Sequence, residues 1–219
     1  MELSAIILAR AIASVESFDL NPFGKLYYPD LARKLVERYG FQKFPQLAED
    51  FDETKGVTFA TGRFNGIVID QLMIFAFGIA LDTRTTTSDS KTLLTEAFQW
   101  LRKDLGIEYP PTAVKRWLYA SQLTFHSSAK LASLHPALEK FCSSLTDSVQ
   151  GYAEDAPPYE PTIISFDHDQ LLRKHPLGRF SIQRRDNVPF SDNKYFSDAP
   201  LETEVHIRLL TELESALMA

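Results

Sequence analysis

Apolar residues along the chain follow helical spacing in some segments and strand alternation in others. Residues 3–15 carry apolar side chains at intervals that fit a helix slightly better than a strand, so we predict a short, mostly buried helix there. A second helix is predicted over about 29–39. Pro29 suits its first turn and Gly40 suits a left-handed C-cap.

The clearest strand signal begins at Val57 and runs to Phe64. Asn65-Gly66 follows, a dipeptide that suits a tight hairpin because both turn residues take positive φ. The run from Ile67 to Leu81 is apolar on both of its alternating faces. We therefore predict one long strand, central in its sheet, with Phe75 and Phe77 on the same buried face.

Several shorter segments complete the pattern. Ser88 or Asp89 is expected to cap a helix that Gly106 ends. The remaining predicted elements are a strand over 117–127, a helix from Pro136 to about residue 150, strands near 162–166 and 179–185, and an amphipathic helix from about residue 200 to the C-terminus. Together they predict an α+β fold. Its mixed or mainly antiparallel sheet has about five strands and is covered by helices.

Length and composition favour a single globular domain spanning residues 1–219. The chain is 44% hydrophobic and contains 16 Phe, so it can bury a sizeable core. The polar, proline-rich stretch 152–161 is the best candidate for a minor internal boundary, although its length is typical of a connection.

Charge and cysteine content narrow the class of protein further. A net charge of −6 argues against a protein that coats nucleic acid non-specifically, because such binding needs a surplus of Lys and Arg. Cys142 is the only cysteine, which fits a reducing compartment. The N-terminal segment lacks the basic start of a signal peptide, and no apolar run approaches the length of a bilayer span. We expect a soluble cytoplasmic protein.

Two segments superficially resemble sequence motifs of proteins that bind or hydrolyse phosphate groups. Asp50-Phe51-Asp52-Glu53-Thr54 has the Asp-x-Asp-x-Thr spacing of aspartate-nucleophile phosphatases. The residues before it cannot form the buried strand that this chemistry needs, so we interpret it as a solvated acidic turn. The hydroxyl-rich segment 82–91 lacks the glycines of a phosphate loop and is interpreted as ordinary helix capping.

Asp167, His168 and Asp169 offer a candidate metal or acid–base site. Carboxylate and imidazole ligands suit Mn²⁺ or Zn²⁺ when further ligands converge on them. Adjacent side chains of a strand point to opposite faces, however, so only the two aspartates share one face. The alternative interpretation is a polar loop at the end of a strand.

A basic segment, residues 173–185, is the least expected feature in an acidic chain. It contains no acidic residue, and arginine is well suited to forked contacts with carboxylate or phosphate. The alternative is a solvated hairpin whose arginines pair with the acidic loop 154–160 or the acidic helix 202–214. The candidate binding residues are Arg173, Lys174, Arg179, Arg184 and Arg185.

The functional hypothesis that we favour is a non-catalytic intracellular binding or assembly protein acting through protein–protein contact or self-association. It rests on the aromatic content, the uneven charge and the lack of a recognisable catalytic motif. One alternative is a nucleic-acid or anion-binding module that uses the basic segment. A second is a metal-dependent hydrolase built on Asp167, His168 and Asp169. We expect no cofactor, no metal and no membrane partner. Whether the chain is an enzyme stays open, although the sequence favours a protein without catalytic activity.

Overall fold

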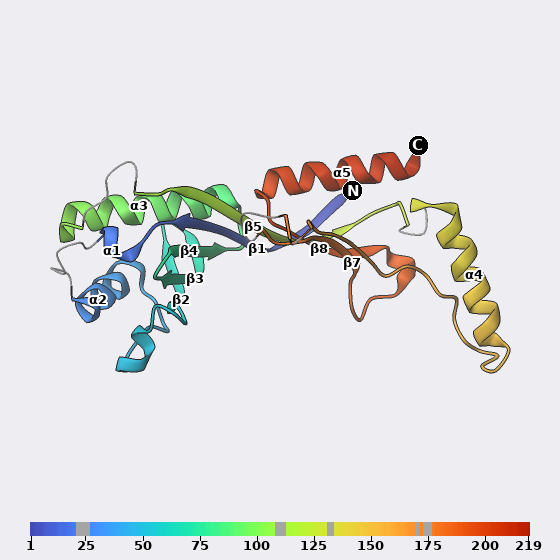
Figure 1. Cartoon of the computed structure of the whole chain (residues 1–219), viewed down its shortest axis with the longest axis horizontal. Coiled ribbons are helices and arrows are strands. Elements are labelled where there is room, and N and C mark those ends of the chain that lie inside the picture. The colour runs from blue at the N-terminus through green and yellow to red at the C-terminus, as the bar shows by residue number, and fades with distance from the viewer. Residues whose placement is uncertain (21–26, 108–112, 131–133, 170, 173–176) are drawn as a thin grey trace. The chain divides into compact units, whose positions relative to one another are not determined.

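The computed structural model describes residues 1–20, 27–107, 113–130, 134–169, 171–172 and 177–219. Within these residues the strands form one sheet in the order β2-β3-β4-β1-β5-β8-β7-β6. Figure 1 labels most of these strands along the chain. The strands are β1 (Glu2–Ser14), β2 (Val57–Phe64), β3 (Ile67–Phe75), β4 (Gly78–Thr83), β5 (Arg116–His126), β6 (Ile163–Phe166), β7 (Phe180–Arg184) and β8 (Lys194–Ala199). The α-helices are α1 (Ser17–Leu20), α2 (Tyr28–Tyr39), α3 (Thr87–Leu105), α4 (Pro136–Gln150) and α5 (Thr203–Met218).

The chain divides into two compact units. Unit 1 comprises Met1–Ala5, Gln122–Pro200 and Glu204–Ala219, and unit 2 comprises Ile6–Ser121 and Leu201–Thr203. The expected boundary in loop 152–161 would lie inside unit 1. The prediction of a single domain stays a prediction.

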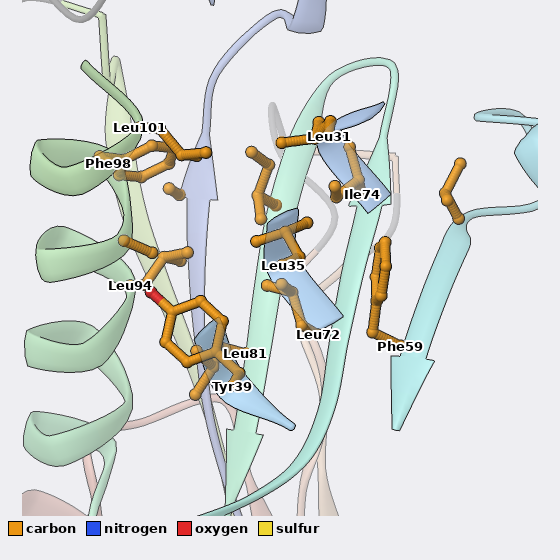
Figure 2. Close-up of a cluster of buried hydrophobic side chains, with 14 of the residues drawn as sticks. Leu31, Leu35, Tyr39, Phe59, Leu72, Ile74, Leu81, Leu94, Phe98 and Leu101 are labelled. Atoms are coloured by element: carbon orange, nitrogen blue, oxygen red, sulfur yellow. The ribbon is translucent and has the colours of Figure 1, made fainter. Parts of the chain in front are cut away.

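Unit 2 packs α2 and α3 against its strands. Leu31 and Leu35 of α2 lie one turn apart, so both reach the same core. Leu94, Phe98 and Leu101 give α3 a matching stripe, and Figure 2 shows these three side chains pointing toward those of α2 and of the strands. The core of unit 2 therefore lies between two helices and one face of the sheet.

The hairpin between β2 and β3 confirms the predicted Asn-Gly turn. Asn65 has φ of 48° and Gly66 has φ of 82°, as a tight hairpin of this kind requires. The helix ends were also predicted correctly, since Gly40 and Gly106 both adopt the left-handed C-cap conformation. The N-cap of α3 is Thr86, whose hydroxyl accepts from the Asp89 amide, and not Ser88 or Asp89 as expected.

The apolar run 67–81 is two antiparallel strands, so the prediction of one long strand is wrong. Leu72 pairs with Leu81 and Ile74 with Ile79 across the β3–β4 hairpin. Phe77 lies in the turn and is 77% exposed, contrary to the expected burial. Two paired buried strands and one long buried strand give the same apolar pattern, because either needs cover on both faces.

The segment 3–15, predicted to be a helix, lies almost entirely within strand β1. In β1 the small residues Ala9, Ala11 and Ala13 are buried, and the larger residues between them are partly exposed. This alternation has a period of two. Alanine contributes little to an apolar pattern, however, so the spacing of the larger side chains favoured the prediction of a helix. Pairing of β1 with β4 decides the conformation.

Unit 1 is built around β7 and its neighbours β6 and β8, which pair with it antiparallel. Strand β8 was not predicted. Helix α5 follows, with Leu210 buried and Leu213 beside Phe125, Ile182 and Tyr195.

The fold class is α+β, as predicted, but the eight strands of the described residues exceed the expected five. The strands expected near 117–127, 162–166 and 179–185 are present as β5, β6 and β7. Within the described residues, no helix combines the length and apolar character that a bilayer crossing requires.

Candidate functional site

Arg184 of the predicted basic segment is a buried structural residue. Its guanidinium forms an ion pair with Glu160 and donates to the Phe190 carbonyl at 2.9 Å. It also lies 4.3 Å from the Phe190 ring centroid and 5.4 Å from that of Tyr195. Its position fits the interpretation in which the arginines pair with loop 154–160.

The other candidate cations of this segment differ in environment. Arg179 is exposed and pairs with Asp167 at 3.1 Å, while Arg185 is exposed beyond the end of β7. Arg173 and Lys174 lie outside the described residues. Within the described part of the segment, the arginines do not form one shared basic face, since Arg184 is turned inward.

Asp167, His168 and Asp169 do not converge on a common point. Asp167 accepts from the His168 amide at 2.8 Å and pairs with Arg179, while Asp169 accepts from the Leu171 amide at 2.9 Å. All three are exposed. No group of three or more His, Cys, Asp or Glu residues arranged to hold a metal ion is found among the residues that the structure describes.

Ser197 and His206 form a buried pair that the sequence did not indicate. The Ser197 hydroxyl donates to the Ser181 carbonyl at 2.8 Å, and its oxygen lies 2.8 Å from His206 Nε2. Since the serine proton is directed to a carbonyl, Nε2 must be the donor to the serine oxygen. A nucleophilic serine needs the reverse arrangement and access to substrate, and both residues are fully buried. The pair is structural.

The Asp50–Thr54 segment is an acidic turn, as interpreted from its sequence. Asp50 accepts from the Leu47 and Gln46 amides, which lower the pKa of its carboxyl. Asp52 accepts from the hydroxyl and the amide of Thr54, and these two bonds lower its pKa likewise. Both carboxylates are held by local hydrogen bonds and shape the turn.

Helix α4 carries an apolar stripe with little cover. Pro136 begins the helix, and His135 caps it by accepting from the Ala137 amide. Thr146 is its only buried residue. Phe141 is 64% exposed and Leu138 is 39% exposed. The stripe consists of Leu138, Phe141, Cys142, Leu145 and Val149, which recur at three- and four-residue intervals along one face.

The segment after α4 covers one flank of this stripe. The Tyr159 amide donates to the Thr146 hydroxyl at 2.9 Å, and the Gln150 side chain donates to the Ala156 carbonyl at 3.1 Å. Leu138 and Phe141 lie nearer the start of the helix and remain open. Sequence periodicity identified the stripe, but only the structure shows that Leu138 and Phe141 are exposed while Cys142, Leu145 and Val149 are half-buried.

No protein-family model matches the chain, and no curated protein is significantly similar to it.

Among the arrangements described above, the α4 stripe is the candidate site that the geometry supports best, because Leu138 and Phe141 are exposed.

Proposed function

We propose that this chain is a non-catalytic binding or assembly protein that acts through protein–protein contact, and that the α4 stripe is its contact surface. The observation that carries the proposal is the exposure of Leu138 and Phe141 on an otherwise regular amphipathic helix. Contiguous apolar surface on a water-soluble chain is typical of an interaction site.

The partner that the stripe fits best is a second copy of the chain. About a point between Ser143 and Ser144, Leu138 corresponds to Val149 and Cys142 to Leu145, while Phe141 corresponds to Thr146. Two such helices packed antiparallel around a two-fold axis would place these two apolar pairs opposite each other, with Phe141 opposite Thr146. Lys140 and Asp147 lie on the other side of the helix, so the charges stay in water.

Sedimentation velocity over a range of concentrations tests this self-association. We expect a wild-type dimer that dissociates on dilution, and we expect Phe141→Glu to weaken it by about thirtyfold or more, because a central aromatic side chain commonly contributes about 2 kcal/mol. Ser143→Glu is the matched control, since it adds the same charge on the exposed face outside the stripe. Its dimer should be unaffected.

At a concentration low enough for the wild type to be monomeric, the thermal midpoint of the two variants should stay near that of the wild type, because both positions are exposed. A wild-type chain that stays monomeric at every concentration would show that the stripe does not bind a second copy. Equal effects of Phe141→Glu and Ser143→Glu would exclude the stripe as the contact.

A further inference from the structure

Unit 2 contains an apolar cavity of about 240 Å³ within its core. Among the described residues that line it, every side chain except those of Tyr28 and Glu53 is hydrocarbon. Phe18, which is 70% exposed, is one of the lining residues. Ordinary cores contain few voids larger than one water molecule, so a space of this size is unusual.

The described lining residues come mainly from α2, α3 and β3, and α1 and β4 also contribute. Leu31 and Leu35 of α2 line one wall, and Ala97 of α3 lines another between larger apolar neighbours. Leu72 and Ile74 of β3 form the floor, since alternate residues of a strand share a face. Several of these side chains are drawn in Figure 2. Ala97 has the smallest side chain among the described lining residues.

The polar end of the cavity is a hydrogen-bonded pair. The Tyr28 hydroxyl donates to the Glu53 carboxylate. Burial raises the pKa of Tyr28 well above its ordinary value, and the hydrogen bond and negative charge of Glu53 raise it further. The phenol is therefore neutral at physiological pH, and its oxygen can still accept a hydrogen bond while it donates to Glu53.

We propose that this cavity binds a small molecule with a hydrocarbon body and one hydrogen-bond donor, an alcohol or an amine, placed at Tyr28 and Glu53. The walls favour the hydrocarbon, and the two polar oxygens accept from the donor. Glu53 disfavours an anionic end group, so a carboxylic acid of the same length binds poorly. An apolar cavity of about 150 Å³ holds benzene, so this one holds roughly ten non-hydrogen atoms.

Titration calorimetry with 1-octanol, octylamine and octanoate tests the proposal on the full chain. We expect the alcohol or the amine to bind and octanoate to bind at least about tenfold more weakly. At a hundredfold excess over Kd, the bound ligand should raise Tm by about 5–10 °C.

Two variants and one control locate the site. Ala97→Leu adds three non-hydrogen atoms inside the cavity, which leaves too little room for the nine of 1-octanol, so binding should be lost, whereas Ala216→Leu adds the same atoms at an exposed position of α5 and should leave binding unchanged. Glu53→Gln should bring octanoate binding close to that of octanol, and this result does not depend on the folding of the core variant. Binding that persists in Ala97→Leu, or no binding by wild type, would overturn the proposal. Equal binding of octanol and octanoate to wild type would overturn the assigned ligand class.

Discussion

Arg10 and Asp82 lie directly opposite each other in the β1–β4 pair and form a forked ion pair. Nε and one terminal nitrogen of the guanidinium each donate to a separate carboxylate oxygen at 2.7 Å. Asp82 is almost completely buried, while the Arg10 side chain is 31% exposed. The cross-strand register aligns the two groups, and the parallel fork makes the contact geometrically specific.

We expect Asp82→Ala to destabilise the protein by about 2–4 kcal/mol, because it leaves a half-buried guanidinium without its main acceptor. Asp70→Ala is the control. Asp70 pairs with Arg84 at the same distance of 2.7 Å, but Arg84 is largely exposed, so its loss should cost less than about 1 kcal/mol. Urea unfolding of the two variants checks this. Equal losses would show that burial does not determine the strength of these pairs.

Gly56 and Gly66 both have positive φ, at 90° and 82°, but differ in the space around them. A Cβ at Gly56 would lie 2.4 Å from the Phe75 ring, whereas nothing lies within 4 Å at Gly66. Gly66→Ala should cost about 1 kcal/mol from backbone strain. Gly56→Ala should cost about 1–3 kcal/mol more, because the ring must move. If urea unfolding gives the two variants the same free energy of unfolding, the Phe75 ring can move aside without destabilising the protein.

The Arg184–Glu160 pair should behave as a coupled structural unit. Removing either partner leaves the other poorly compensated, so Arg184→Ala and Glu160→Ala should each cost about 3 kcal/mol. The double variant should cost less than their sum, with a coupling of about 1–3 kcal/mol. Arg185→Ala, at an exposed neighbour, should change stability by no more than about 0.5 kcal/mol. Additive effects in the double-mutant cycle would mean that the pair does not anchor loop 154–160.

His206 should make stability depend on pH. Burial lowers its pKa to about 4, below the value of about 6.5 expected in the unfolded chain. Between these values the unfolded state binds the proton and the folded state does not, so stability falls as the pH decreases from 6.5 to 4. The loss from this residue is on the order of 3 kcal/mol.

His206→Gln provides the comparison, because it keeps a donor near Ser197 and does not titrate. The difference in unfolding free energy between wild type and this variant should shrink by about 3 kcal/mol from pH 7 to pH 4. If the unfolding free energies of wild type and His206→Gln change in parallel with pH, His206 is not the group whose titration changes stability.

The predicted site residues show where sequence reasoning succeeds and where it stops. The basic segment was identified from its charge, but the inward turn of Arg184 toward Glu160 joins residues 24 positions apart. The α4 stripe was identified from its period, but its exposure depends on which other elements reach it. The apolar cavity had no sequence signal, since its described walls come from α1, α2, α3, β3 and β4.

What the sequence by itself determined was local: the Asn65-Gly66 turn, the glycine caps after α2 and α3, and the helical period of α4. These features depend on backbone preferences and on side chains within one or two turns of the chain. The tertiary structure decided that residues 3–15 form a strand, that 67–81 bends at Phe77, and that Glu160 is the partner of Arg184. Those outcomes depend on partners distant in sequence, because strand pairing and burial are stabilised by contacts that no local pattern contains.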